Sequence, residues 1–320
     1  MIRRRHLLIG GAALGMARTG FAAQQAFGLL VGGKAGSSAD EGARAFIPFL
    51  CRHLPFTDIA VRNIPGGAGL VAMQALAAAE PAGSTLAWAV TPTLPARMVD
   101  RGSDDLMQRI VLLGAVQKEP IAFVSPAATP LGSVQDIIGK SAEDADGVPL
   151  GTPPPGSPPH LAALRLQALA GTRLNIVTFP SATAARQAAV AGNVAAAALG
   201  LSSAIGDLRA GRLTGLGIAA DDRTDVFPDL PPLHDSGLDL SAVIYRGLAA
   251  PAGLSDELAA RLRQALEAVA NDPEFGEQAN TGGYLASWID GREWAAMAAA
   301  ERTELAKLWA TEPWLQEGSG

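Results

Sequence analysis

The chain has 320 residues, 48% hydrophobic and 18% charged, a composition typical of a globular protein with a buried core. Its formal net charge of −6 and the absence of a basic stripe exclude nucleic acid as a partner, because phosphate binding relies on clustered Lys and Arg. Its single cysteine excludes an intrachain disulfide.

The first 23 residues are predicted to form an export signal. Arg3, Arg4 and Arg5 precede an apolar run over 7–16 and small residues that end at Ala22 and Ala23. The run is too short to cross a bilayer, which takes about 20 residues. Both a twin-arginine signal and a general secretory signal fit this pattern. We therefore expect a periplasmic protein, with a net charge near −10 once the four arginines of the signal are removed.

The first half of the mature chain alternates strands and helices. Strands are predicted over 27–31, 57–62 and 85–90. A helix is expected to begin near 39–41, with Ser38 or Asp40 as its cap, and an alanine-rich helix is expected over 70–79. Pro48 should bend the first helix or mark its restart. This alternation predicts parallel strands covered by helices on both faces.

The same pattern recurs in a second α/β unit, after a junction near 120–130. The C-terminal part is expected to be helical, with one helix capped by Ser255 and another over 291–309. Strands are predicted over 148–152, 174–179, 194–199 and 213–219, and helices over 160–170, 182–191 and 202–210.

Two catalytic motifs are present only in incomplete form. The stretch 28–35 has the spacing of a phosphate-binding loop, but Ala35 replaces the Ser or Thr that would bind magnesium. Ser202 follows Gly200 as in a nucleophile elbow, yet acyl transfer also requires a histidine and an acid. A serine hydrolase that uses Ser202 is therefore kept only as an alternative. No metal-ligating spacing stands out, so we expect no enzyme, no cofactor and no metal site.

Three loops each lie between a predicted strand and the start of a predicted helix, over 35–40, 65–69 and 152–160. A helix start presents free N–H groups and a favourable dipole for negative charge, and glycine lets the backbone approach a ligand. In open α/β sheets, ligands bind beyond the carboxyl ends of the strands. Because the loops come from two units, they predict two jaws that close on a small anion.

Six short segments, in order along the chain, carry a family resemblance. They are 36–44 with Asp40 and Arg44, the glycine loop 63–69 with the turn 80–86, the run 156–161 with Ser157 and His160, and the stretches 208–216, 223–237 and 245–253. In these segments the chain resembles the Bug family, the extracytoplasmic solute-binding receptors of tripartite tricarboxylate transporters.

The resemblance implies the fold of a type II periplasmic binding protein, a Venus-flytrap with two doubly wound α/β domains and two crossover strands. Domain one would comprise 24–122 and 243–320, and domain two 123–242. It also implies a monomer that captures a small carboxylate, an organic acid or an amino acid, and delivers it to membrane permease subunits. A ligand-binding component of a sensory system is the alternative that the sequence leaves open.

The loops and the resemblance together predict the ligand-binding residues. Family members often carry Pro-Tyr-Lys-Gly where this chain has Phe-Pro-Ser-Ala at 179–182, so the Tyr, Lys and Gly are replaced. Ser37 and Ala82 are further departures that concern the identity of the ligand. The predicted contacts are Ala35, Gly36, Ser37, Ser38, Asp40, Gly66, Gly67, Ala68, Thr91, Thr152, Gly156, Ser157, His160 and Ser181, with Asp40 expected to orient its loop.

Overall fold

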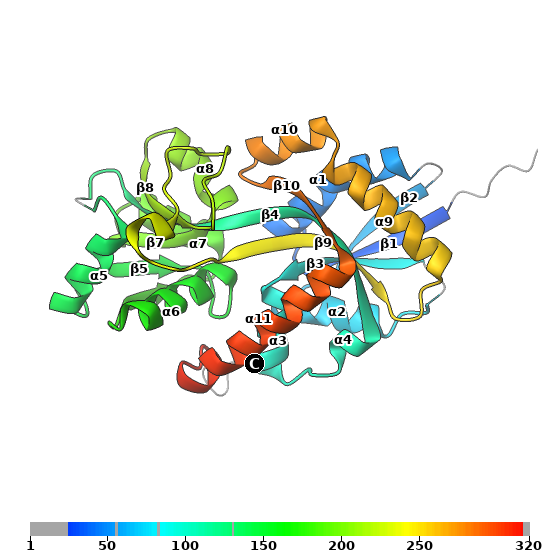
Figure 1. Ribbon diagram of the computed structural model, residues 1–320, viewed down its shortest axis with the longest axis horizontal. Helices are drawn as coiled ribbons and strands as arrows, with labels where there is room; N and C mark the ends of the chain where they lie inside the picture. The colour runs from blue at the N-terminus through cyan, green and yellow to red at the C-terminus, as the bar shows by residue number, and fades with distance from the viewer. Residues whose placement is uncertain (1–24, 55–56, 82–83, 130, 316–320) are drawn as a thin grey trace, which may run out of the picture.

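The computed structural model describes residues 25–54, 57–81, 84–129 and 131–315. The predicted export signal and Ala82 lie outside these residues. Figure 1 shows two groups of strands and helices, here called the first and second lobe, with the long strands β4 (Ile110–Pro126) and β9 (Val243–Pro251) running between them. No helix in the described part of the chain is long and apolar enough to cross a membrane.

The first lobe is built on the strand order β2-β1-β3-β9-β4. Strand β1 pairs in parallel with β2 and β3, whereas β9 lies antiparallel to β3 and β4, and β10 lies antiparallel to β4. Its further elements are β1 (Gln25–Val31), α1 (Ser38–His53), β2 (Thr57–Asn63), α2 (Leu70–Ala77), β3 (Thr85–Thr91), α3 (Thr93–Arg101), α4 (Leu106–Arg109), α9 (Asp256–Ala270), α10 (Pro273–Thr281), β10 (Leu285–Asp290) and α11 (Gly291–Thr311), with a 3-10 turn at Gly67–Gly69.

The second lobe continues from the same long strand. Strand β4 pairs with β9 from Ile110 to Pro120 and with β7 and β8 from Ile121 onward. Strand β5 pairs in parallel with β6 and β7. Its elements are α5 (Val134–Glu143), β5 (Pro149–Thr152), α6 (Pro158–Ala170), β6 (Asn175–Thr178), α7 (Ala182–Val190), β7 (Ala196–Gly200), α8 (Leu201–Arg209) and β8 (Leu213–Ala219), with a 3-10 turn at Leu233–Ser236.

Each lobe has a core on both faces of its sheet, because side chains alternate along a strand. In β1, Leu29 packs with α1 and α9 residues, whereas Leu30 packs on the opposite face with α2 and α11 residues. In β4, Phe123 faces the core under α5 and α6, and Val124 faces the core under α7 and α8. The expected α/β architecture with helices on both faces is confirmed, but each sheet is mixed and not wholly parallel.

Several local expectations need correction. The cap of α1 is Ser37, whose hydroxyl accepts from the Asp40 N–H at 3.4 Å, and the helix runs unbroken through Pro48. The stretch 28–31 lies in β1, which rules out a phosphate-binding loop there. Elements α3, α4, α5, α10 and β10 were not expected, and the division of the chain at 122 and 243 stays a prediction.

Candidate functional site

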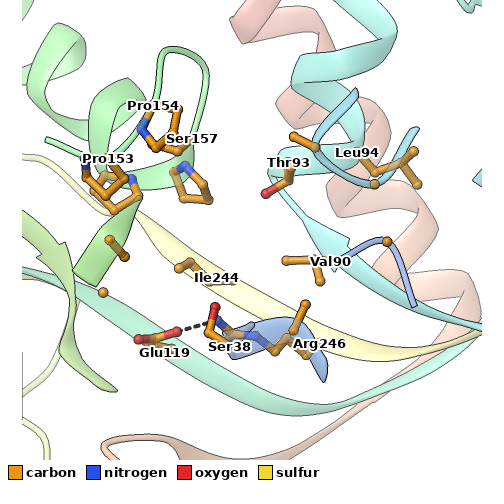
Figure 2. Close-up of a pocket in the computed structure, with 18 of the residues that line it drawn as sticks. Ser38, Val90, Thr93, Leu94, Glu119, Pro153, Pro154, Ser157, Ile244 and Arg246 are labelled. Atoms are coloured by element: carbon orange, nitrogen blue, oxygen red, sulfur yellow. Dashed lines mark ion pairs between the residues drawn. The ribbon is translucent and has the colours of Figure 1, made fainter. Parts of the chain in front are cut away.

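A cavity of about 270 Å³ lies between the two lobes, above β4 and β9 (Figure 2). The first turns of six helices contribute to its lining: α1, α2 and α3 from the first lobe and α6, α7 and α8 from the second. A wider, more polar trench of about 720 Å³ adjoins it. The residues that line both spaces are Ser38, Ala182, Ser202 and Ser203.

Helix starts give this cavity a surplus of hydrogen-bond donors. The first N–H groups of a helix have no partner within it, and the helix dipole makes that end partly positive. Ser38 and Ala39 open α1, and Ser203 lies in the first turn of α8, so both lobes aim such groups at the cavity. This arrangement favours an anion.

The floor of the cavity carries a buried ion pair between the crossover strands. Arg246 of β9 lies 2.5 Å from Glu119 of β4, and their side chains are 9% and 1% exposed. Glu119 Oε1 also accepts the Ser202 N–H at 2.9 Å, and the Arg246 guanidinium lies 4.9 Å from the centre of the Tyr284 ring. Burial acts to lower the pKa of Arg246, but the Glu119 carboxylate and Tyr284 together raise it, so the cation is retained. Arg246 Nη1 has no hydrogen-bond partner among the described residues.

Gly200 makes the contact between Glu119 and α8 possible. A Cβ at this position would lie 2.4 Å from Glu119 Oε1, so the carboxylate would have to shift. The absence of a side chain at residue 200 therefore leaves room for the carboxylate beside the first turn of α8. The same glycine begins the sequence that resembled a nucleophile elbow.

Asp40 holds the loop between β1 and α1, here called the first glycine loop. Its carboxylate accepts the Gly36 N–H and the Asn63 amide, each at 2.9 Å, and pairs with Arg44 at 2.9 Å. The hydrogen bond from Arg44, with those from Gly36 and Asn63, lowers the pKa of Asp40 to about 2. Asp40 does not line the cavity, so it shapes the loop from behind.

The second glycine loop, between β2 and α2, packs directly on the first. Gly32 and Gly69 approach so closely that a Cβ on Gly32 would lie 2.4 Å from the Gly69 Cα. Ala68, at the tip, has φ 51° and ψ 39°, the left-handed region that favours glycine. Ala68 lines the cavity in this strained conformation.

The loop after β5 forms the facing wall. Gly156 donates its N–H to His160 Nδ1 at 3.4 Å, and the Thr152 hydroxyl donates to the Pro153 carbonyl at 3.1 Å. Burial, with a smaller effect of Arg97, lowers the pKa of His160 to about 4, so the ring is neutral and can accept. His160 therefore holds the loop and does not line the cavity.

The predicted binding residues fall into four groups. Ser38, Ala68 and Ser157 line the cavity, and Gly36, Ser37 and Ser181 line the adjoining trench, where Ser181 caps α7. The Thr91 hydroxyl accepts from Trp294 and borders a different, smaller space. The remaining residues lie outside the cavity lining and support the loops around it: Ala35, Asp40, Gly66, Gly67, Thr152, Gly156 and His160.

Sequence reasoning missed Glu119 and Arg246, which lie 127 positions apart and meet only through β4–β9 pairing. The available signal was the presence of charged residues inside two largely apolar strands, because a buried charge needs a partner.

The structure gives Ser202 a structural role. Its backbone N–H donates to the Glu119 carboxylate, and its side chain hydrogen-bonds Tyr284. Burial is the main cause that raises the pKa of Tyr284. No histidine in the described part of the chain lines the cavity, and no cluster of metal-ligating side chains occurs there either.

Comparisons with known proteins agree on one family. The model of the tripartite tricarboxylate transporter family receptor matches residues 50–308. A UPF0065 protein of Bordetella bronchiseptica is 27% identical over 289 residues, which are 88% of this chain and 84% of that protein.

Two solved structures share the fold. MatC from Rhodopseudomonas palustris with bound malate superposes with a TM-score of 0.73 at 21% identity, over 88% of this chain and 98% of that one. An R. palustris protein solved with adipate gives 0.77 at 17% identity, over 89% and 96%. The chain belongs to the receptor family of the tripartite tricarboxylate transporters, whose members are solute-binding proteins.

Proposed function

We propose that this protein captures a small carboxylate outside the cytoplasm and passes it to the membrane subunits of a tripartite transporter. The observation that carries the proposal is the meeting of helix starts from both lobes with the buried Arg246 at one end of the cavity. The related structures with malate and adipate support the carboxylate class. Delivery to permease subunits rests on family membership alone.

The geometry also supports closure on the ligand. The donors of α1 and α8 belong to different lobes, so an anion contacts both sets only when the lobes are together. A ligand with such differential contacts shifts the population toward the closed form. Closure in turn presents the receptor surface that a permease would bind.

Calorimetric titration of purified protein tests the capture step. The titrants are carboxylates paired with their primary amides, which keep the shape of each acid and remove its charge. The proposal expects binding of at least one acid and a loss of at least tenfold for its amide, because a charge-assisted hydrogen bond contributes about 1.5–3 kcal/mol. Equal affinity for acid and amide, or no binding across the panel, would contradict it.

Uptake by cells tests the delivery step. A radiolabelled carboxylate that binds in calorimetry is supplied to cells that express the candidate permease with and without this protein. Uptake that requires both components supports the proposal. Uptake that is unchanged by the receptor would show that the captured ligand serves another purpose, such as signalling.

A further inference from the structure

Both charged side chains of the cavity lining lie at one end, and the opposite end is mainly apolar apart from the hydroxyls of Thr93 and Ser157. Figure 2 shows Ser38, Glu119 and Arg246 near the crossover strands, and Pro153, Pro154 and Leu94 at the opposite end. We infer that the ligand is a monocarboxylate with an apolar body, such as an arene carboxylate or a short-chain fatty acid. This inference rests on the proposed function and specifies its ligand class.

The second lobe builds an apolar wall from proline. The cavity is lined there by Pro153 and Pro154 from the loop and by Pro158 and Pro159 from the start of α6. Proline has no N–H, so α6 presents rings where other helices present donors. Leu70, Met73 and Leu94 of the first lobe also line the cavity.

The charges in the lining leave room for only one carboxylate. Among the described residues, Arg246 is the only cation that lines the cavity, and Glu119 already compensates much of its charge. A second carboxylate on the same ligand would enter the proline end without a counter-charge, where desolvation opposes it. The hydroxyls of Thr93 and Ser157 can bond a neutral substituent there but cannot balance a charge.

The volume sets the size of the body. A cavity of about 270 Å³ lies at the lower end of the range of small-molecule sites, which runs from about 300 to 1,000 Å³. A carboxylate with one six-membered ring, or with a chain of about six carbons, fills this space. A larger ligand would require the lobes to separate or to occupy the adjoining trench.

Benzoate and malate separate polarity from size, because the two anions have the same number of non-hydrogen atoms. Titrations of the full-length mature protein with benzoate, hexanoate, malate and adipate are compared under one buffer condition. The inference expects benzoate or hexanoate to bind at least about tenfold tighter than either dicarboxylate, from the penalty of an unpaired buried carboxylate. Malate or adipate binding as tightly as the monocarboxylates would overturn the inference and leave the proposed function standing. If none of the four binds, the inference fails, and the wider panel of acids and amides then decides on the proposed function.

A matched pair of variants on α2 tests whether the apolar body of the ligand packs against this helix. Met73 lines the cavity and is buried, whereas Val71 on the same helix is 42% exposed and lies outside the lining. Met73→Gln should weaken benzoate binding about tenfold or more, and Val71→Gln should leave it unchanged. A melting curve verifies that each variant is folded. Unchanged benzoate affinity in a folded Met73→Gln protein would contradict the placement of the apolar body.

Discussion

Arg246 has two roles that a double variant can separate. In the fold it neutralises Glu119, which is 1% exposed and otherwise accepts only the Ser202 N–H in the described structure. In the cavity it is the cation beside the expected carboxylate. Arg246→Met removes both roles at once, so it lowers stability and ligand affinity together.

The expected losses of stability and affinity in Arg246→Met follow from the burial of the Arg246–Glu119 pair. Removal of one partner of a buried ion pair destabilises a protein by about 3–5 kcal/mol, because the other charge is left uncompensated. The loss in ligand affinity should reach about 2 kcal/mol or more, roughly thirtyfold. The second change, Glu119→Gln, removes the stranded charge and keeps an acceptor for the Ser202 N–H. The double variant should therefore recover most of the stability and none of the affinity.

Urea denaturation measures the free energy of unfolding of each variant, and calorimetric titration with the preferred carboxylate measures its ligand affinity. Arg302→Met is the control, because it deletes one surface cation that pairs with the exposed Asp104. This control should change stability by about 1 kcal/mol at most and leave binding intact. A double variant that binds like the natural protein would show that the guanidinium does not act on the ligand.

Three further predictions concern the loops. Ala68→Gly should raise the free energy of unfolding by about 1 kcal/mol in urea titrations, because Ala68 holds a left-handed φ of 51° that glycine adopts without strain; a lower value would contradict this. Gly156→Ala should weaken binding and lower the melting temperature, since its φ is +71° and a Cβ would collide with Arg97 of the first lobe; an unchanged crystal structure of the variant would refute it. The His160 ring is neutral in the fold, with its pKa lowered from 6.5 to about 4, so its contribution to the free energy of unfolding is complete above pH 6.5 and is lost as pH falls toward 4. Urea denaturation should show a decrease in that free energy of about 3 kcal/mol over this pH range. A His160→Gln variant with the same pH dependence would contradict the assignment of this effect to His160.

Strands and helices with a clear apolar pattern and a clear end signal were predictable from the sequence. Strand β1 and helix α6 were expected within a few residues of where they lie, because apolar runs and terminal glycines mark them locally. Strand β10 was missed because its side chains are all half-buried and only its partner β4, far away in sequence, makes it a strand. The stretch 120–130 was expected only as a junction, and Pro120 lies inside β4 beside Val243, in a strand much longer than that junction.

The candidate site was predictable as far as helix starts define it. Ser38, Ala68 and Ser157 follow strands in glycine- or proline-rich loops, and topology alone brings such loops to one edge. Thr152 and His160 have polar groups that looked available, but each one bonds its own loop. The charges of the floor come from strand interiors, where only tertiary pairing reveals that Glu119 and Arg246 face each other.

A crystal structure of the protein with benzoate would show where the anion and its ring bind. We expect the carboxylate within hydrogen-bond distance of the first-turn N–H groups of α1 or α8 and close to Arg246, with the ring against Pro154 and Met73. A carboxylate found in the adjoining trench beside Arg186, with the proline-lined cavity free of ligand, would contradict it.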